Sequence, residues 1–377
     1  MLKKKVSENR NKILFGFGII CIVLGIAFFR QISLSTSFLY SLIFNKNIEL
    51  KKESDGSVNI LLLGIGGGTH EGPDLTDTLI FAHVNPTAKS VELVSIPRDL
   101  WIPDISQRIN TAYSIGQDKD KKGKILSRAV VQKVIGEPVD YVFVLDFQGF
   151  VKLVDYLGGI EVDVKRDLTD LEYPIEGKEN DTCGHKEEEL LLLSTASSQL
   201  EAFPCRYRKV HFEKGLTHMN GNQSLDFVRS RHAIGEEGND FARSQRQQET
   251  ITAIEKKVFS LGIILNPVKV FGIYNIISQN IDMDIKPSEF DDFIKLAKKV
   301  RGAKVKNTVL DFGSEQEKRN GILIHPDISA KQDYEWVLIP RAGDGDFSEI
   351  HAYIDCIIKG NVCTVNDKGI GVSEVKN

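Results

Sequence analysis

The residues whose types and spacing could do chemistry include two carboxylates at the end of a glycine-rich loop. The loop runs from Gly64 to Thr78, and its five glycines let the backbone approach a ligand closely. It ends in Asp74 and Asp77, and carboxylate oxygens of this kind suit Mg²⁺ or Mn²⁺. Thr69 stands where a dinucleotide fingerprint needs its third glycine, and no Gly-Lys-Ser/Thr of a P-loop follows. The alternative is a flexible loop whose aspartates only stabilise turns.

Arginines form the second group of candidate residues. Arg98 and Asp99 follow an apolar run typical of a strand, and Arg108 comes shortly after them. Arg98 and Asp99 are alternatively a surface ion pair that contributes ~0–1 kcal/mol. The later members of the group are four arginines and one amide: Arg229, Arg231, Arg243, Arg246 and Gln247.

The last three of these residues fall on a predicted helix. Arg243, Arg246 and Gln247 lie at i, i+3 and i+4, so their side chains are expected on one face of the helix. This face is near the N-terminal end of the helix, where the helix dipole attracts anions. A guanidinium group donates in a planar fork that matches phosphate oxygens. The alternative is a set of salt bridges to Glu236, Glu237 and Asp240. Paired carboxylates with an arginine cluster predict a pyrophosphate site with a divalent cation, which stabilises charge on a leaving phosphate.

The overall charge restricts the class of partner. The formal net charge is -4, and 27% of the residues are charged. Nucleic acid is excluded as a main partner on this ground, because neutralising its phosphates needs a basic surface. Any anion site must therefore be a local cluster of arginines.

The N-terminal segment predicts a membrane anchor. Residues 13–29 form an uncharged run of 17 residues, and five basic residues precede it. This length is near the lower limit for a spanning helix, and the basic flank favours a cytoplasmic N-terminus. We expect a cytoplasmic tail at 1–12, a single span at 13–29 in the cell membrane, and a juxtamembrane linker at 30–57. A cleaved signal peptide is the alternative, although no clean cleavage site follows the run.

The cysteines fit an extracytoplasmic domain. Four of them would lie outside the membrane and form two pairs that are local in the sequence. Proximity suggests the disulfides Cys183–Cys205 and Cys356–Cys363, although four cysteines allow three connectivities. Metal ligation is disfavoured by the absence of a CxxC spacing, and free buried thiols remain an alternative.

The pattern of apolar residues predicts an α/β fold. Strands are expected at 58–65, 78–85, 90–97, 139–147 and 159–164, and helices at 124–135, 147–157, 220–229, 243–261, 267–279, 288–300 and 347–359. The helix at 220–229 begins with Asn-Gly-Asn-Gln, which is typical of an N-cap region. Such alternation favours an α-β-α sandwich around a central mixed sheet. One domain would span 58–365, with an insertion at 166–210 and a C-terminal portion at 266–365. Residues 366–377 are expected to form a disordered tail.

The order of segments resembles the LytR-CpsA-Psr family over residues 58–262, with a weaker continuation to about 360. The segments that carry the resemblance are NILLLG, DLTDT, SIPRDLWIP, RINTAYSIG, VDYVFVLDFQGFVKLVDYLGGIEVDV, GLTHMNGNQSLDFVRSRH and DFARSQRQQE. The VRSRH and DFARSQRQ segments are specific, whereas the glycine loop alone is not.

The resemblance implies a membrane-anchored transferase. Members bind polyprenyl-pyrophosphate-linked glycans, with the lipid in an apolar cavity under the sheet and Mg²⁺ at the pyrophosphate. They attach glycopolymers to a sugar hydroxyl of peptidoglycan, and some are thought to modify proteins. By position, Asp77 would bind the metal, Asp99 would orient Arg98 or the metal's waters, and Asp240 would be a base for the acceptor hydroxyl. The residues implied to hold the phosphates are Arg98, Arg108, Arg229, Arg231, Arg243 and Arg246, with Gln247 beside them.

This chain departs from the family pattern in three places. Arg108 stands where the family usually has a lysine, which keeps the positive charge. Gly66 stands where the family has an aspartate, so Asp74 is the expected replacement ligand and His70 a weaker one. The insertion is also larger than the family pattern suggests, and it could cover the site or bind an acceptor. Two other functions stay open: a protein that binds a polyprenyl phosphate without chemistry, and a lipid pyrophosphatase.

Overall fold

The computed structural model describes residues 47–68, 72–194, 196, 198–258, 260, 267–286, 289–314, 319–328, 330–333 and 335–373. They belong to two compact units, a larger one of Lys51–Asp284 with Val300–Asn377 and a smaller one that includes Ile285–Lys299. The predicted tail at 1–12 and membrane helix at 13–29 lie outside the described residues. Within those residues, none of the helices has the length and apolar content needed to cross a bilayer.

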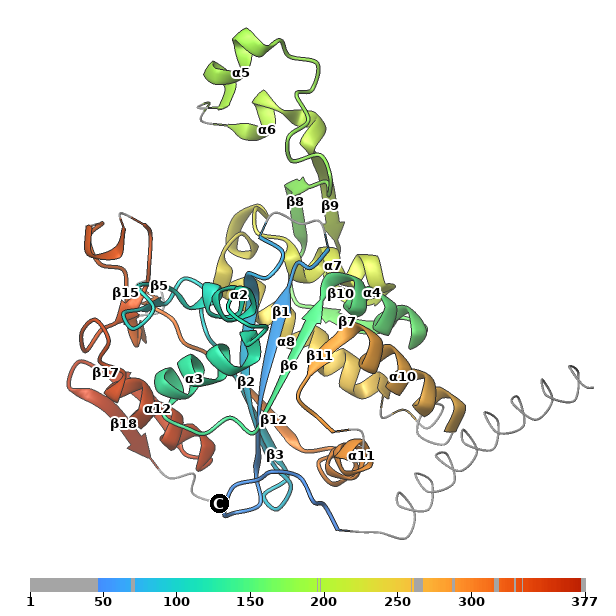
Figure 1. Cartoon of the computed structure of the whole chain (residues 1–377), viewed down its shortest axis with the longest axis vertical. Coiled ribbons are helices and arrows are strands. Elements are labelled where there is room, and N and C mark those ends of the chain that lie inside the picture. Colours follow the sequence, from blue (N-terminus) through green and yellow to red (C-terminus); the bar gives the residue numbers. More distant parts are fainter. Residues whose placement is uncertain are drawn as a thin grey trace, which may run out of the picture. The chain divides into compact units, whose positions relative to one another are not determined.

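The larger unit is built on a six-stranded mixed sheet (Figure 1). Its strand order is β11-β6-β1-β2-β3-β12, and the pairs β1–β6 and β3–β12 are parallel while the others are antiparallel. The strands are β1 (Val58–Ile65), β2 (Thr76–Asn85), β3 (Ser90–Ser95), β6 (Tyr141–Asp146), β11 (Ile281–Met283) and β12 (Lys304–Val309).

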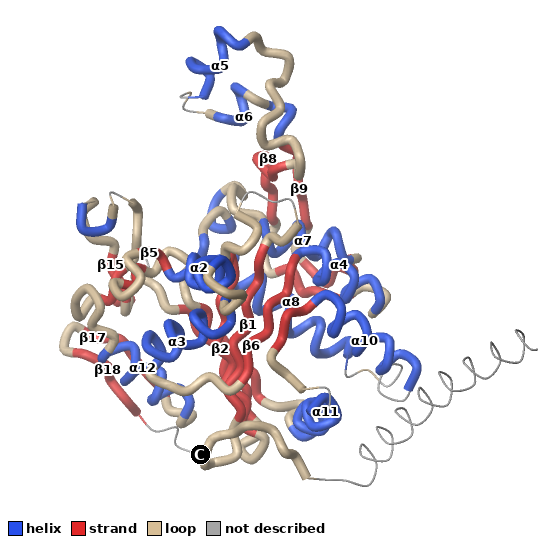
Figure 2. The backbone as a smooth tube through the Cα atoms, viewed as in Figure 1, coloured by secondary structure: helices blue, strands red, loops and turns tan. Residues whose placement is uncertain are grey.

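The two faces of the sheet bury alternate side chains. Leu61 and Leu63 of β1 pack with residues of α3 (Gly123–Ile135) and α12 (Ser348–Ile358). Ile60 and Leu62 belong to a second cluster that includes Ile251 of α8 (Asp240–Val258). Because side chains alternate along a strand, an apolar run buried on both faces requires helices on both sides. The predicted α-β-α arrangement around a mixed sheet is therefore confirmed for this unit (Figure 2).

Helix ends follow local chemistry. α4 (Phe147–Tyr156) begins after Asp146, whose carboxylate accepts a hydrogen bond from the Gly149 amide at 2.6 Å. α7 (Gly221–Arg229) begins with a capping box in which Asn220 and Gln223 each accept from the other's backbone amide. Asn220 was the predicted cap, and it fixes where the arginine-bearing end of α7 emerges. The other elements around the sheet are β4 (Trp101–Ile102), β5 (Gln107–Arg108), α2 (Ala112–Asp118), β7 (Ile160–Val164), β10 (Gly215–Met219), α10 (Pro267–Asn280), β13 (Gly313–Ser314), β14 (Arg319–Asn320), β15 (Leu323–Ile324) and β16 (Ile339–Pro340).

The predicted insertion is a hairpin that carries a small helical end. β8 (Leu168–Pro174) pairs antiparallel with β9 (Tyr207–Phe212), and Figure 1 shows α5 (Glu187–Ser194) and α6 (Gln199–Ala202) beyond the hairpin. The disulfide Cys183–Cys205 closes this end, as proximity in the sequence predicted.

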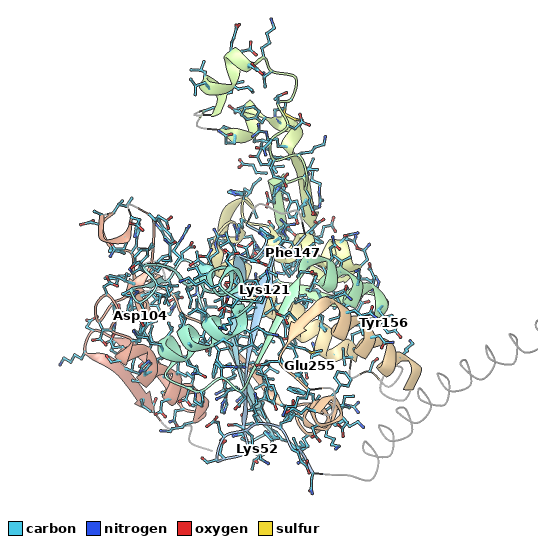
Figure 3. All side chains as sticks on the ribbon, viewed as in Figure 1. Lys52, Asp104, Lys121, Phe147, Tyr156 and Glu255 are labelled. Carbon is cyan, nitrogen blue, oxygen red and sulfur yellow. A yellow bond between two sulfur atoms is a disulfide. The ribbon has the colours of Figure 1, made fainter. Side chains whose placement is uncertain are left out.

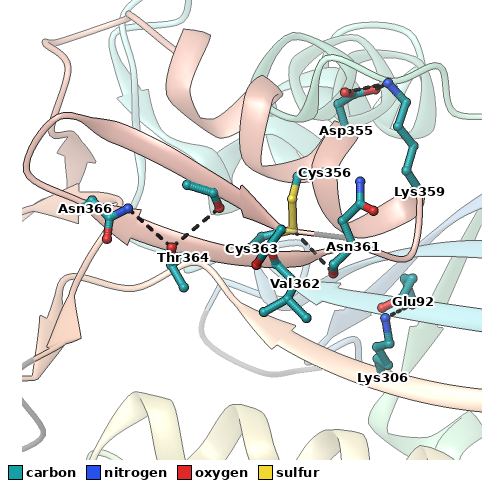
Figure 4. Close-up of a disulfide and its surroundings, with 12 residues drawn as sticks. Glu92, Lys306, Asp355, Cys356, Lys359, Asn361, Val362, Cys363, Thr364 and Asn366 are labelled. Carbon is teal, nitrogen blue, oxygen red and sulfur yellow. Dashed lines mark hydrogen bonds and ion pairs between the residues drawn. A yellow bond between two sulfur atoms is a disulfide. The ribbon is translucent and has the colours of Figure 1, made fainter. Parts of the chain in front are cut away.

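A second hairpin corrects the predicted tail. β17 (Val362–Asn366) pairs with β18 (Gly369–Ser373), so residues 366–373 are ordered rather than disordered. The disulfide Cys356–Cys363 joins β17 to α12 (Figure 4), and Val365 and Ile370 pack against the main core. An apolar contact and a covalent link together keep this end folded. The predicted linker also extended too far, because Ser57 is fully buried.

The smaller unit contains α11 (Phe290–Lys299), close to the helix predicted at 288–300. Lys295 is buried and makes ion pairs of 2.9 Å with both Asp291 and Asp292. Asp292 also accepts a hydrogen bond from the Glu49 amide at 3.2 Å. These contacts connect the helix to the chain segment that precedes the sheet.

Candidate functional site

Asp77 is the point where three separate segments meet. Its Oδ1 accepts a hydrogen bond of 2.8 Å from Arg98, which follows β3, and another of 2.8 Å from Arg231, which follows α7. Burial alone would raise the pKa of Asp77, but Arg231, Arg98 and Arg243 outweigh it and hold that pKa below its ordinary value. The structure thus brings together the carboxylate and guanidinium groups that the sequence placed in one site.

Asp77, Arg231 and Arg243 border an open pocket with a cavity volume of about 270 Å³, whereas Arg98 is not among its lining residues. Thr78 of β2 and Phe147 of α4 contribute to its wall. Arg243 and Gln247 lie four residues apart on α8, one turn of helix, so both reach the pocket. The predicted site residues that line it are Asp77, Arg229, Arg231, Arg243 and Gln247.

Arg229 lies between two aromatic rings that line the same pocket. Its guanidinium carbon is 4.2 Å from the ring centroid of Phe147, which Figure 3 labels, and 5.8 Å from that of Tyr173 on β8. On the Tyr173 ring, Arg208 of β9 also stacks at 4.5 Å. Each cation–π contact contributes about 0.5–2 kcal/mol and restricts where the guanidinium can point. Arg229 is therefore held by α4 and the hairpin together.

Arg246 does not belong to this pocket, and its predicted role as a phosphate ligand is wrong. Only 2% of the residue is exposed. Its guanidinium donates to the Glu237 carboxylate at 2.6 Å and to the backbone oxygens of Phe227 and Ser230 at 3.0 and 2.5 Å. The salt bridge considered as the alternative is thus the observed arrangement. Arg246 stabilises the turn that presents Arg229 and Arg231 to the pocket.

Asp99 and Arg108 contact each other outside the pocket lining. Asp99 is buried, with its carboxylate 3.5 Å from Arg98 Nε and 3.2 Å from Arg108 Nη1. Arg108 also forms an ion pair of 3.0 Å with Glu335. These contacts fit the predicted orienting role of Asp99 toward Arg98. Neither Asp99 nor Arg108 is among the residues that line the pocket, and their predicted catalytic and phosphate-binding roles stay predictions.

The predicted cation ligands are only partly brought together. Asp74 does not line the pocket, and its charge instead helps, after burial and Asp282, to raise the pKa of Tyr113. His70 and the side chain of Asp240 lie outside the described residues. Mg²⁺ typically keeps several waters and binds one or two carboxylates together with substrate phosphates. Asp77 fits that mode as a single protein ligand beside an anion pocket.

The sequence interpretation left open that the insertion covers the site, but it named none of the hairpin residues that line this pocket. Five residues of β8 and β9 line it: Asp170, Glu172, Tyr173, Pro174 and Tyr207. His232, directly after Arg231, lines it as well. Because His232 directly follows a predicted site arginine in the VRSRH segment, the sequence could have indicated that it lies in the pocket. Nothing in the composition of the insertion indicated that its strands would reach the arginines.

Curated proteins similar to this chain are transferases of one kind. The protein named polyisoprenyl-teichoic acid--peptidoglycan teichoic acid transferase TagU from a Bacillus cereus strain is 28% identical over 253 residues, or 66% of each chain. TagV from Bacillus subtilis, with the same transferase name, is 25% identical over 65% of this chain and 53% of its own. The matched region thus spans 66% of TagU and about half of TagV.

Solved structures show the same fold. The crystal structure of Bacillus subtilis TagV has a TM-score of 0.53 and 22% identity, covering 80% of this chain and 97% of that one. TagT bound to LIIa-WTA has a TM-score of 0.51 and 20% identity, covering 82% and 94%. The model of the LytR_cpsA_psr family matches residues 34–332, which include every strand of the central sheet and every residue of the pocket. The chain belongs to the LytR-CpsA-Psr family.

Proposed function

We propose that this protein is a membrane-anchored transferase that moves a glycopolymer from a polyprenyl-pyrophosphate carrier to a sugar hydroxyl of peptidoglycan. The observation that carries the proposal is the hydrogen bonding of Asp77 to Arg98 and Arg231 at the edge of an arginine-lined pocket. Three arginines, Arg229, Arg231 and Arg243, line the pocket in a chain that is acidic overall. Such a concentration of guanidinium groups matches a diphosphate, which carries two negative charges.

The chemistry follows from charge development at the leaving group. When a hydroxyl attacks the phosphorus that carries the glycan, the departing lipid phosphate gains negative charge. Arginines held in place beforehand stabilise that charge without reorganising during the reaction. Arg229 is restricted by its two rings, and Arg231 by its hydrogen bond to Asp77. The pocket is therefore suited to a transition state with an extra charge.

We further propose Mg²⁺ as the cofactor, held by Asp77 together with phosphate oxygens of the donor. The bound ion would neutralise the diphosphate and favour departure of the lipid phosphate. Gly66 offers no carboxylate where the family resemblance implies one. The protein therefore offers one carboxylate fewer to the cation than the family pattern does. We expect its affinity for Mg²⁺ to depend strongly on whether the lipid-diphosphate substrate is bound.

The relatives support the class of donor and acceptor, since their names specify a polyisoprenyl-linked teichoic acid and peptidoglycan. The two disulfides among the described residues support an extracytoplasmic location, because such bonds persist in oxidising compartments. The apolar run at 13–29 supports a single membrane span with a cytoplasmic N-terminus. Protease treatment of intact spheroplasts tests this topology, and protection of the cysteine-containing domain would contradict it.

The activity is tested with full-length protein in detergent, given a lipid-diphosphate-linked glycan, Mg²⁺ and peptidoglycan fragments. Covalent transfer of the glycan to the fragments is the expected result. Release of lipid phosphate without transfer would instead identify a pyrophosphatase. Binding of the donor without turnover would identify a binding or regulatory protein.

A further inference from the structure

The pocket contains a histidine–carboxylate pair that the roles described above do not use. His232 Nδ1 lies 3.9 Å from the Glu172 carboxylate, and both residues line the pocket. His232 comes from the turn after α7, whereas Glu172 comes from β8 of the insertion. The His232 side chain is 61% exposed, so its ring is accessible to a ligand that enters from solvent.

The backbone that carries His232 is fixed by the same hairpin. The fully buried Asp170 of β8 accepts hydrogen bonds from the Ser230 hydroxyl at 2.6 Å and from the amides of Arg231 and His232 at 3.2 and 3.3 Å. One carboxylate therefore sets the positions of two neighbouring side chains. Arg231 donates to Asp77, and His232 lies beside Glu172.

The hairpin also gives this part of the pocket the composition of a sugar site. Tyr173, Pro174 and Tyr207 line it next to Glu172. Tyr173 is 3% exposed, and burial raises the pKa of its hydroxyl, with Arg229 opposing the shift and Asp226 adding to it. Flat rings with a few polar groups are the usual lining of small-ligand sites. On the side of α7 and α8, the pocket is thus lined mainly by arginines. On the side of the hairpin, it is lined by aromatic rings and carboxylates.

We propose that the hairpin side of the pocket receives the acceptor sugar and that His232, oriented by Glu172, is the base that takes the proton of the acceptor hydroxyl. This inference rests on the proposed transferase function. The hydroxyl oxygen bonds to the phosphorus that carries the glycan, and the bond from that phosphorus to the bridging oxygen breaks. Polyprenyl phosphate leaves with the bridging oxygen. The proton moves to the imidazole and then to the leaving phosphate or to solvent.

The charged groups around the imidazole favour this use. Glu172 faces Nδ1, Asp170 binds the backbone amide, and Arg229, Arg231 and Arg243 line the same pocket. A carboxylate on one ring nitrogen holds the ring orientation and stabilises the imidazolium that forms when the other nitrogen accepts a proton.

The test compares His232→Gln and Glu172→Gln with wild-type full-length protein between pH 5 and 8. The donor is a farnesyl-diphosphate-linked disaccharide, the acceptor is a peptidoglycan fragment, and binding of inorganic pyrophosphate is measured in parallel. We expect His232→Gln to lose about 100-fold or more of the transfer rate, the usual share of a general base, while pyrophosphate binding changes less than 3-fold. Wild-type activity should fall as the pH drops through the range where histidine gains a proton, and the variant should lack this dependence.

Glu172→Gln should move the acidic fall in rate to lower pH, because removing a negative neighbour makes the imidazole less basic. The matched control is His218→Gln, which removes the histidine of another pair, 2.7 Å from Glu161, outside the pocket lining. It should match wild type. Wild-type rate and pH dependence in His232→Gln would overturn the inference, as would lost pyrophosphate binding. A wild-type protein that binds pyrophosphate but transfers nothing would overturn the proposed function and the inference with it.

Discussion

Arg246 and Glu237 form a buried ion pair of 2.6 Å on the side of α8 that does not line the arginine pocket. Through the same guanidinium group, the pair is joined to the backbone oxygens of Phe227 and Ser230. Arg229 at the end of α7 and Arg231 just after it line the pocket, and their positions thus depend on a cation that is not part of the lining. Arg246 thus acts by holding the backbone around the end of α7 in place.

Replacing Arg246 by Ala should therefore lower stability rather than chemistry alone. Removing Arg246 leaves Glu237 with Arg166, at 2.7 Å, as an ion-pair partner, but it takes the donor away from the backbone oxygens of Phe227 and Ser230. We expect a loss of about 3 kcal/mol. Urea unfolding followed by circular dichroism measures the change. Lys256→Ala, at an exposed position of the same helix, is the control and should unfold like wild type. An Arg246→Ala protein with an unchanged midpoint would show that the network contributes nothing.

Glu249, on the same helix, should make the free energy of unfolding depend on pH. Burial is the main cause that raises its pKa to about 7, with Lys165 opposing and Glu237 adding to the shift. A carboxyl whose folded pKa exceeds its unfolded value binds its proton more tightly when folded, so stability is greatest below about pH 4.5 and declines as pH rises to about 7. Glu249→Gln should remove this decline and add about 1 kcal/mol at pH 8, since solvent screens a half-exposed group. Equal slopes of unfolding free energy against pH in both proteins would contradict the assignment.

The disulfide Cys183–Cys205 should stabilise the helical end of the insertion locally. It closes a loop of 22 residues, for which chain entropy gives about 3 kcal/mol. In the double variant Cys183→Ser, Cys205→Ser, trypsin should cleave first at Lys178 or Lys186, and mass spectrometry of the fragments shows where. Cys356→Ser, Cys363→Ser is the control, and it should leave the insertion resistant. Cleavage of both variants at the same sites would mean that the bond does not protect this segment.

Gly66→Asp should strengthen cation binding by adding a carboxylate near Asp77. We expect about 10-fold tighter Mn²⁺ binding in the presence of inorganic pyrophosphate, measured by electron paramagnetic resonance, because hard cations gain affinity with each charged oxygen ligand. Asp74→Asn should leave the titration unchanged, since Asp74 does not line the pocket. A weaker titration in Asp74→Asn would restore that residue as the replacement ligand.

The fold was predictable where apolar patterns were long. The continuous run at 58–65 became β1, and Asn220 capped α7 as predicted. The tail at 366–373 was missed because a short hairpin held by Cys363 and two apolar contacts has too weak a pattern of its own.

The site was predictable where the segments carried charge. The convergence of Arg98 and Arg231 on Asp77 joins residues 154 positions apart, and it was expected from residue type and family resemblance. Arg246 was misassigned because helical spacing alone does not tell which of two neighbouring faces meets the pocket. Spacing within α8 could not reveal that Glu237 occupies the other face.

Arg229 contacts the rings of Phe147 and Tyr173, and Tyr173 belongs to the insertion. The insertion therefore has one part that contacts a pocket arginine and another part that does not, and the two should differ in how well they tolerate substitution. Tyr173 and its strand neighbours line the pocket, so a change there alters the surroundings of Arg229. The stretch between Pro174 and Tyr207 supplies none of the lining among its described residues. We therefore expect the stretch between Pro174 and Tyr207 to accept substitutions, deletions and grafted segments. The ends of β8 and β9 that line the pocket should not accept such changes.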